Sequence, residues 1–254
     1  MISIIILAHN EELNIKKAII SVLNELKNYD YEIIAVNDNS DDSTGKILNV
    51  LSKKHTKVKV FHKIHLKSGP TGLGSALRYG FSHAHGSVLI PFMGDLSDDP
   101  RDIVKLIKKI NEGYDVVVGS RFIDGSKLVG YPPIKLVCNR LYNEFFRLIF
   151  FLHIKDISNA FKAYKRKVID TIKPKSKGFE ITSEIILKAH IMGFKITEVP
   201  VSWSGRREGK SKFGSFFAVI KVGFMYVKLS LILWLKFYSK VFQKTLNLLK
   251  FTSH

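Results

Sequence analysis

Residues 91–100, PFMGDLSDDP, join a short apolar run to a cluster of aspartates. The run, Ser87 to Phe92, predicts a buried strand. Asp95 follows it directly, with Asp98 and Asp99 close behind. Open α/β sheets bind ligands at the carboxyl ends of their strands, so these carboxylates predict a ligand site. Mg²⁺ and Mn²⁺ bind carboxylate oxygens and often bridge them to substrate phosphates, which predicts a metal at Asp95. Asp99 is instead the expected cap of the next helix.

The composition describes a globular chain with a large excess of positive charge. Of its 254 residues, 46% are hydrophobic and 24% are charged, which is enough for a substantial core. The formal net charge of +18 predicts an anionic partner: a nucleic acid, a phosphorylated substrate or a membrane surface. The single cysteine, Cys138, excludes an internal disulfide and a cysteine zinc cluster. The N-terminal run MISIIILA has no preceding basic region and predicts a strand rather than a signal peptide.

Apolar runs alternate with amphipathic stretches along the chain. The predicted strands are 2–8, 31–36, 58–61, 87–92, 115–118 and 195–201, and the predicted helices are 12–27, 43–53, part of 67–86, 103–110 and 178–192. Continuous apolar runs are typical of central parallel strands, because helices cover both of their faces. The alternation therefore predicts an α/β protein with a doubly wound, mostly parallel sheet flanked by helices.

A glycine-rich loop precedes the third predicted helix. Gly69, Gly72 and Gly74 allow the backbone to approach another group closely. The spacing matches neither a P-loop, which ends in Gly-Lys-Ser/Thr, nor the dinucleotide fingerprint, which follows a first strand. Two interpretations stay open: a phosphate contact, and a plain loop with a tight helix–sheet contact at Gly80.

Five short motifs occur in the order typical of one enzyme family. They are LAHNEELNI (7–15), NDNSDDST (37–44), GLGSALRYGFSHAHG (72–86), GSRF (119–122) and EVPVSWSGRREGKSKF (198–213). Together they resemble the family 2 glycosyltransferases, and within them the polyprenyl-phosphate sugar synthases, over residues 1–214. The resemblance implies the GT-A fold, a Rossmann-like, mostly parallel sheet flanked by helices. It also implies inverting transfer of a sugar from a nucleotide-diphosphate sugar.

The resemblance implies a donor site at the ends of the first strands. Ala8, Asn10, Glu11 and Asp38 would hold the base and ribose of a GDP- or UDP-sugar. Carboxylates suit this role because they accept hydrogen bonds from base N–H groups and ribose hydroxyls. Gly72 would approach the donor from the glycine-rich loop.

The metal motif departs from the family pattern. The family carries Asp-x-Asp, whereas this chain has Met93, Gly94 and Asp95, so the first carboxylate is missing. Asp95 is then the only aspartate of that motif expected to bind Mg²⁺ or Mn²⁺. Asp98 and Asp99 are candidates for a further ligand. An inactive relative is the alternative that this departure leaves open.

Basic side chains are expected at the phosphates. By resemblance, Arg121, Arg206 and Lys212 would contact donor or acceptor phosphates, which suits the forked guanidinium of arginine. Lys135 and Asn139 stand where the lipid-phosphate synthases carry an arginine and a serine for the acceptor phosphate.

The predicted catalytic residues are Asp95, Arg121 and Glu184. Glu184 matches the acidic residue that lies near the acceptor in the family. A phosphate acceptor is already ionised near neutral pH and needs little base catalysis. A hydroxyl acceptor would need a general base, for which Glu184 or Glu180 is the candidate.

The last fifth of the chain is basic and apolar. Residues 201–254 contain ten basic residues and one acidic residue, and so carry half of the formal net charge. Between 216 and 238 the lysines recur about every seven or eight residues, which places them on one helical face. We predict that 215–254 forms amphipathic helices on an anionic membrane surface, with a tilted or re-entrant span through 229–235 as the alternative. The helix expected at 134–154 is either a second interfacial helix or a core-packing one.

The sequence as a whole predicts a GT-A domain at 1–214 and a membrane-associated segment at 215–254. The expected activity is sugar transfer to a lipid acceptor, a polyprenyl or dolichyl phosphate, at the cytoplasmic face of a membrane. A glycan or another lipid as acceptor, and a non-catalytic GT-A relative bound to membranes, are the alternatives. Nucleic acid is not an expected partner, because the basic residues alternate with long aliphatic ones and no RNA- or DNA-binding motif occurs.

Overall fold

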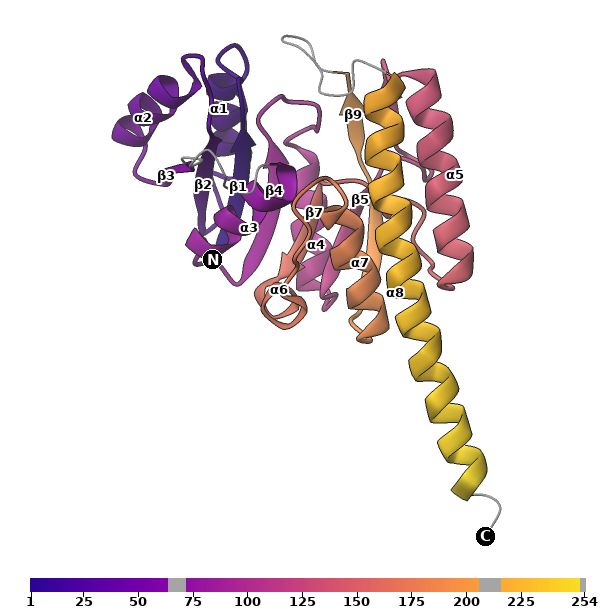
Figure 1. Ribbon diagram of the computed structural model, residues 1–254. Coiled ribbons are helices and arrows are strands. Elements are labelled where there is room, and N and C mark those ends of the chain that lie inside the picture. The colour runs from indigo at the N-terminus through magenta and orange to yellow at the C-terminus, as the bar shows by residue number, and fades with distance from the viewer. Residues whose placement is uncertain (64–71, 206–215, 252–254) are drawn as a thin grey trace.

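The computed structural model has a seven-stranded sheet between two layers of helices (Figure 1). It describes residues 1–63, 72–205 and 216–251, and of 216–219 and 240–251 only the backbone. The strand order is β3-β2-β1-β4-β7-β5-β8, with all neighbours parallel except β7, which runs antiparallel to β4 and β5. These strands are β1 (Ile2–Ala8), β2 (Tyr31–Asp38), β3 (Val58–Lys63), β4 (Val88–Met93), β5 (Val116–Ser120), β7 (Lys162–Lys165) and β8 (Ile196–Pro200). A small second sheet pairs β6 (Lys127–Val129) with β9 (Ser202–Ser204).

Helices cover both faces of the large sheet. The helices are α1 (Ile15–Glu25), α2 (Thr44–Lys54), α3 (Leu73–His83), α4 (Asp102–Asn111), α5 (Pro133–Ile149), α6 (Arg166–Ile172), α7 (Ile181–Ile191) and α8 (Phe216–Phe251). One core lies between the sheet and α1, α2 and α4, and the other between the sheet and α3, α5, α6, α7 and α8. In β1, Ile4 and Ile6 face the first core, while Ile5 and Leu7 face the second. The apolar run of β1 is therefore buried on both sides, as the sequence predicts.

Four short elements were not predicted: β6, β7, β9 and α6. Strand β7 contains Lys162, which is fully buried inside the sheet layer. Its ammonium group donates hydrogen bonds to the carbonyls of Ile157, Asn159 and Thr182. These partners come from two separate segments, so local apolar patterning cannot indicate that a lysine-containing segment is a core strand.

The close approaches expected of Gly72, Gly74 and Gly80 are found, and they are internal to the protein, whereas Gly69 lies outside the described residues. A Cβ on Gly80 would lie 2.4 Å from Cγ2 of Ile5, so α3 packs tightly on β1 only because the side chain is missing. Gly72, at φ 111°, begins α3, and a Cβ there would lie 2.7 Å from the carbonyl oxygen of Lys177. A Cβ on Gly74 would likewise lie too close to the carbonyl oxygen of Ser176. Gly72 and Gly74 therefore serve the packing of α3 on residues 176–178.

The C-terminal part is one helix of 36 residues, about 54 Å long at the α-helical rise of 1.5 Å per residue. Its first half packs against α7 and α5, and its far end extends beyond the body (Figure 1). Leu233 is buried in the second core, and the Ser230 hydroxyl lies 2.8 Å from the hydroxyl of Tyr142 on α5. Residues after 214 thus complete the core as well as forming a surface. Within the described residues, no helix combines the length and apolarity needed to cross a membrane.

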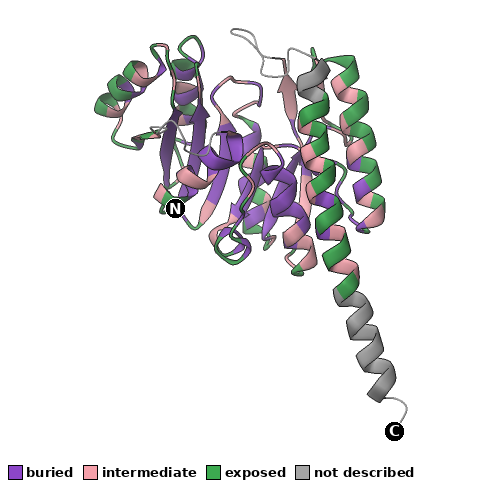
Figure 2. Cartoon of the chain, viewed as in Figure 1, coloured by how far each residue is buried: buried purple, intermediate pink, exposed green. Residues whose placement is uncertain are grey.

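Helix α5 is both a core helix and an exposed apolar one. Asn143 and Phe146 are buried on its inner side. Leu141, Phe145 and Leu148 are more than half exposed on its outer side. Figure 2 shows the same contrast across the molecule, with buried residues concentrated in the sheet and exposed residues along α5 and α8.

Candidate active site

A cavity of about 900 Å³ lies where the carboxyl ends of β1, β2 and β4 meet α5 and α8. Polar side chains line its inner part and apolar side chains line the part between the two helices. Among the predicted site residues, those that line it are Ala8, Glu11, Asp38, Asp95, Arg121, Lys135 and Asn139. The topology thus brings seven predicted positions, from five separate parts of the fold, to one cavity.

The loops after β1 and β2 hold the first carboxylates in place. Glu11 is buried, accepts a hydrogen bond from Nδ2 of Asn14 at 3.0 Å, and its backbone N–H donates to Oγ1 of Thr44 at 2.8 Å. Asp38 is buried and forms an ion pair with Lys63 at 3.0 Å. The two loops are therefore tied to each other, and both carboxylates have fixed positions.

Two predicted donor residues do not line the cavity. Asn10 is exposed, with φ 57°, and links the loops instead: its N–H donates to Oγ of Ser40, and its Oδ1 accepts from the N–H of Asp41. Gly72 packs against Lys177 at the start of α3. Neither position supports a direct donor contact in this structure.

Asp95 and Asp98 form the acidic wall of the cavity. A turn after β4 brings them to the same side: Leu96 has φ 57°, and the N–H of Ser97 donates to Oδ1 of Asp95 at 3.0 Å. Asp98 is 3% exposed, and burial together with the nearby charge of Asp95 raises its pKa to about 8. Its Oδ1 is buried with no hydrogen-bond partner among the described residues.

These residues fit a divalent cation. Met93 lines the same cavity without offering a ligand, which leaves Asp95 and the unsatisfied oxygen of Asp98. Mg²⁺ is usually held by one or two carboxylates together with substrate phosphates. No cluster of three or more Asp, Glu, His or Cys suited to a metal occurs among the described residues, so substrate oxygens would complete the coordination.

Arg121 is the fixed cation of the site. Its Nε and Nη2 donate to the two carboxylate oxygens of Asp156 at 2.8 and 2.9 Å. Further bonds, each of 3.2 Å, run to the hydroxyls of Tyr131 and Ser158. Asp156 is fully buried, and its charge raises the pKa of Arg121 above the ordinary arginine value although burial alone would lower it. The guanidinium therefore stays charged and keeps one orientation.

Lys135 and Asn139 lie beside it on α5. The Lys135 ammonium is 4.9 Å from the ring centre of Tyr131 and 5.8 Å from that of Trp203, within the range of cation–π attraction. Burial and the nearby Arg121 lower the pKa of Lys135 to about 8. Asn139 donates from Nδ2 to the Tyr131 hydroxyl and accepts from Oγ of Ser158.

Four residues of this wall were missed by sequence reasoning: Tyr131, Asp156, Ser158 and Trp203. Asp156 and Ser158 belong to DISNAFKAYK, a segment that resembles a family motif but suggests no role by itself. Tyr131, on the loop before α5, and Trp203, in β9, come together edge to face, with ring centres 4.7 Å apart. Their proximity depends on the pairing of β6 with β9, which is not visible in the sequence.

Glu184 does not line the cavity. Its carboxylate accepts hydrogen bonds from the backbone N–H groups of Lys175 and Ser176 and pairs with Lys188. Glu180 is buried and accepts from the N–H of Gly178. Both carboxylates hold the segment before α7, which corrects the expectation of a base at the acceptor. Arg206 and Lys212 lie outside the described residues.

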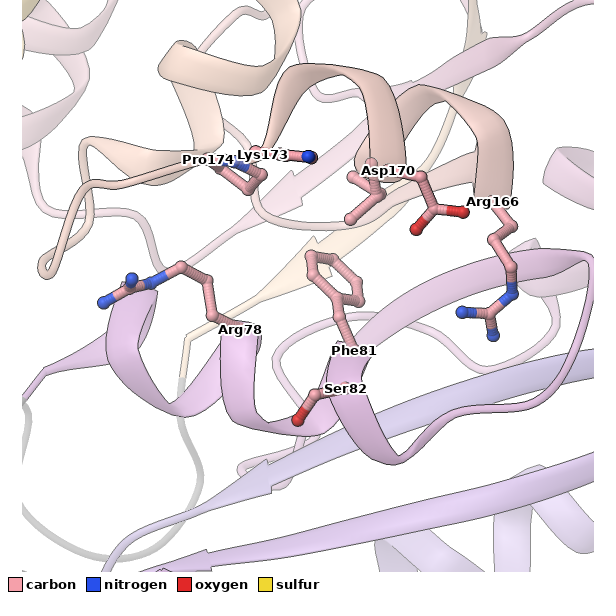
Figure 3. A pocket seen from close by; sticks show the side chains of 8 residues that line it. Arg78, Phe81, Ser82, Arg166, Asp170, Lys173 and Pro174 are labelled. Carbon is pink, nitrogen blue, oxygen red and sulfur yellow. The ribbon is translucent and has the colours of Figure 1, made fainter.

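A second, shallower cavity of about 450 Å³ lies between α3 and α6. Figure 3 shows the ring of Phe81 on α3 pointing toward Asp170 and Lys173. Two arginines line it, but both already donate to backbone carbonyls: Arg78 to Gly74, and Arg166 to Gly86 and Ala84. Both arginines are therefore used by the fold.

Comparison with known proteins agrees with the fold and the motifs. Residues 3–173 match the family model for glycosyl transferase family 2. A dolichol-phosphate mannosyltransferase of Pyrococcus furiosus is 32% identical over 213 residues, which cover 83% of this chain and 58% of that protein. A polyprenol monophosphomannose synthase of Mycolicibacterium smegmatis is 30% identical over 187 residues, covering 71% and 69%. The chain belongs to glycosyltransferase family 2.

Solved structures confirm the predicted fold. Glucosyl-3-phosphoglycerate synthase from Mycobacterium tuberculosis, in complex with Mn²⁺, UDP and phosphoglyceric acid, superposes with a TM-score of 0.71 at 15% identity. The superposition covers 92% of this chain and 78% of that one. The mostly parallel sheet flanked by helices is therefore a GT-A fold. The same enzyme has also been crystallised with Mg²⁺ and UDP.

Proposed function

We propose that this protein is an inverting glycosyltransferase that moves a sugar from a nucleotide-diphosphate sugar to a polyprenyl phosphate at a membrane surface. The observation that carries the proposal is the single large cavity. It combines carboxylates at the strand ends, fixed cations beside them, and exposed apolar side chains at its mouth. Such a cavity suits two substrates of different character, a polar donor and a lipid-linked anion.

The inner end supports a GDP- or UDP-sugar donor. Asp38 and Glu11 are held rigidly at the ends of β2 and β1, where an open α/β sheet binds its ligand. Their carboxylates suit the N–H and hydroxyl groups of a nucleoside. The two relatives are named as a mannosyltransferase and a mannose synthase, which favours a hexose as the transferred sugar.

The middle of the cavity suits the phosphates. Asp95 is placed to hold Mg²⁺ or Mn²⁺, and a bound divalent cation supplies charge neutralisation for a leaving diphosphate. Arg121 adds a permanent positive charge whose direction is set by Asp156 before any substrate arrives. Lys135 and Asn139 face the same space from α5 and would contact the acceptor phosphate.

The position of the glutamates favours an acceptor that is already ionised. Glu184 and Glu180 do not line the cavity, so neither is placed to remove a proton from a hydroxyl. A phosphate acceptor requires no such step near neutral pH. This geometry favours a polyprenyl phosphate over a glycan or a hydroxyl-bearing lipid.

The mouth of the cavity supports a lipid. Leu141 and Phe145 on α5, and Val227 and Leu231 on α8, line it and are also exposed. They belong to two exposed apolar stripes with helical spacing: Ile134, Val137, Leu141, Phe145 and Leu148 on α5, and Ile220, Phe224, Val227, Leu231 and Leu235 on α8. We call these the two apolar stripes, and propose that they enter the outer part of a bilayer.

Positive charge accompanies the stripe on α8. Lys221, Lys228 and Lys236 are exposed, each one residue after a stripe position and so about 100° further round the helix. A helix with apolar and basic faces side by side suits the surface of a membrane that contains anionic lipid. We place the protein at the cytoplasmic face, since that leaflet carries the anionic lipids.

The test is a transfer assay with the full chain. Radiolabelled GDP- and UDP-sugars are offered with Mg²⁺ or Mn²⁺ and a short-chain polyprenyl phosphate in detergent. The expected product is a labelled lipid with inverted anomeric configuration. Label on a glycan or hydroxyl lipid instead would refute the phosphate acceptor. If calorimetry detects no binding of any nucleotide diphosphate, the protein is a non-catalytic relative.

A further inference from the structure

The carboxylate of Asp98 has no partner that explains its burial. It is 3% exposed, and its Oδ1 is buried without a hydrogen bond to any described residue. Leaving a buried polar atom unsatisfied costs about 1–3 kcal/mol, and more for a charged group. Such atoms are rare in native proteins and call for a functional or structural reason.

The neighbouring aspartates do have such explanations. Asp99 accepts several hydrogen bonds from Arg101 and does not line the cavity. Asp102 accepts the N–H of Ser202 at 2.6 Å and pairs with Lys105. Of the three acidic residues that follow Asp95, only Asp98 lines the cavity, and its Oδ1 is unsatisfied among the described residues.

The nearest cation does not satisfy Asp98 either. The side chain of Arg121 donates its hydrogen bonds from Nε, Nη1 and Nη2 to Asp156, Tyr131 and Ser158. The backbone around Asp98 is fixed, because the N–H of Ser204 donates to the carbonyl of Ser97 at 2.8 Å and the N–H of Asp99 donates to that of Ser202. The backbone hydrogen bonds of residues 97 and 99 to β9 thus hold the Asp98 side chain in the cavity.

We infer that Asp98 is a second oxygen ligand for the divalent cation, taking over the part of the carboxylate that is missing at Met93. The inference rests on the proposed function, because it assumes a nucleotide-dependent metal site at Asp95. Asp95 and Asp98 face the same cavity across one tight turn. Hard divalent cations take carboxylate oxygens, and one or two carboxylates per ion is the usual number beside substrate phosphates. In this chain the second carboxylate is that of Asp98, five residues after Met93. The turn at Leu96 brings it to the cavity.

Mn²⁺ binding tests this without reliance on catalysis. Electron paramagnetic resonance of the full chain measures free Mn²⁺ alone, with GDP and with UDP. Asp98→Asn is expected to weaken nucleotide-dependent Mn²⁺ binding at least tenfold, as is Asp95→Asn. The control Asp99→Asn should stay within about twofold of the wild type. Met93→Asp combined with Asp98→Asn should recover binding to within tenfold of the wild type.

Several results would overturn the inference. One is wild-type Mn²⁺ affinity in Asp98→Asn, and another is a double variant as weak as Asp98→Asn alone. A third is a fall of more than about 5 °C in the metal-free melting temperature of Asp98→Asn, because that would make Asp98 structural. If the wild type itself binds no Mn²⁺ with either nucleotide, the metal site of the proposed function fails too. If only the Asp98 variants behave like wild type, the proposed function stands without this ligand.

Discussion

The charges of Arg121 and Lys135, two cations of the cavity, depend differently on pH. Asp156 holds Arg121 by two hydrogen bonds and raises its pKa, so its charge is constant. Lys135 lies near Asp95, whose charge raises its pKa, but burial and Arg121 act in the opposite direction. Burial and the charge of Arg121 lower its pKa to about 8. A rise in pH through about 8 therefore removes the charge of Lys135 but leaves that of Arg121.

The pKa of Lys135 predicts that kcat/KM for the acceptor falls as the pH rises. The ammonium is charged below pH 8 and neutral above, so its attraction for a phosphate is lost as the pH rises through about 8. A hydrogen bond to a charged group contributes about 1.5–3 kcal/mol, so kcat/KM for the acceptor should fall roughly tenfold to hundredfold. Lys135→Arg stays charged and should not show this fall. A wild-type profile that is flat to pH 9.5 (roughly the end of the lysine range) would contradict the role.

Asp95 predicts a loss confined to metal-dependent steps. Asp95→Asn removes the carboxylate nearest the end of β4, and turnover should fall by about two orders of magnitude or more, since a metal contributes several kcal/mol of charge stabilisation. Nucleotide binding should lose its dependence on Mn²⁺ in calorimetry. Asp124→Asn is the matched control, because Asp124 is exposed and does not line the cavity. Equal, mild effects of both changes would count against the assignment.

Sequence reasoning brought residues to the cavity where they directly follow a strand. Ala8, Asp38 and Asp95 end or follow β1, β2 and β4, and parallel strands bring these ends together whatever the details of packing. It failed at Glu184, where the helix was correctly expected but its rotation about the axis was not. A residue's place on a helix does not reveal whether it faces a cavity or a neighbouring loop.

At the scale of elements, apolar runs were the most reliable signal. The strand expected at 2–8 has those bounds in the structure, and the helix expected at 103–110 is α4, Asp102–Asn111. Strand β7 was not predicted because it contains Lys162, whose burial depends on carbonyls from two separate segments, one of them 20 residues away. The antiparallel strand in the middle of the sheet was therefore beyond local patterning.

The contact between α3 and β1 predicts a stability change. In Gly80→Ala the new Cβ would lie 2.4 Å from Cγ2 of Ile5 and 3.3 Å from Cγ2 of Val36. Both partners belong to the buried core, so the cost should be about 1–3 kcal/mol. The melting temperature should fall by roughly 2–10 °C in calorimetry. Gly223→Ala on α8 is the control, because a Cβ there meets nothing within 4 Å and should leave stability unchanged or raised.

At the scale of the whole molecule, α8 joins the core to the proposed membrane surface. Leu233 and Ser230 face inward, whereas Phe224 and Leu235 face outward on the same helix. Removal of everything after Gly214 would therefore open the second core, and a stable soluble body is not expected from it. Separate tests of membrane binding must use outward residues only.

The outward stripe of α8 predicts a contribution to membrane binding that salt does not weaken. Phe224 and Leu235 are 67% and 61% exposed and do not line the cavity. Replacing both by serine should cost about 2 kcal/mol of vesicle binding, or roughly thirtyfold in affinity, since partial burial of each side chain contributes about 1 kcal/mol. The fall is measured by co-sedimentation with vesicles that contain phosphatidylglycerol. Turnover on a short-chain acceptor in detergent should not change.

Salt and a control variant separate the two parts of this attraction. Each lysine near an anionic surface contributes about 1 kcal/mol, and this part weakens as salt screens it, whereas the apolar part does not. High salt should therefore strip much of the wild type, and nearly all of the Phe224→Ser/Leu235→Ser variant, from the vesicles. Val50→Ser, which removes a half-exposed apolar side chain from α2, should bind as the wild type does. If the double variant binds as well as Val50→Ser at every salt concentration, α8 does not touch the bilayer, and the acceptor must reach the cavity by another route.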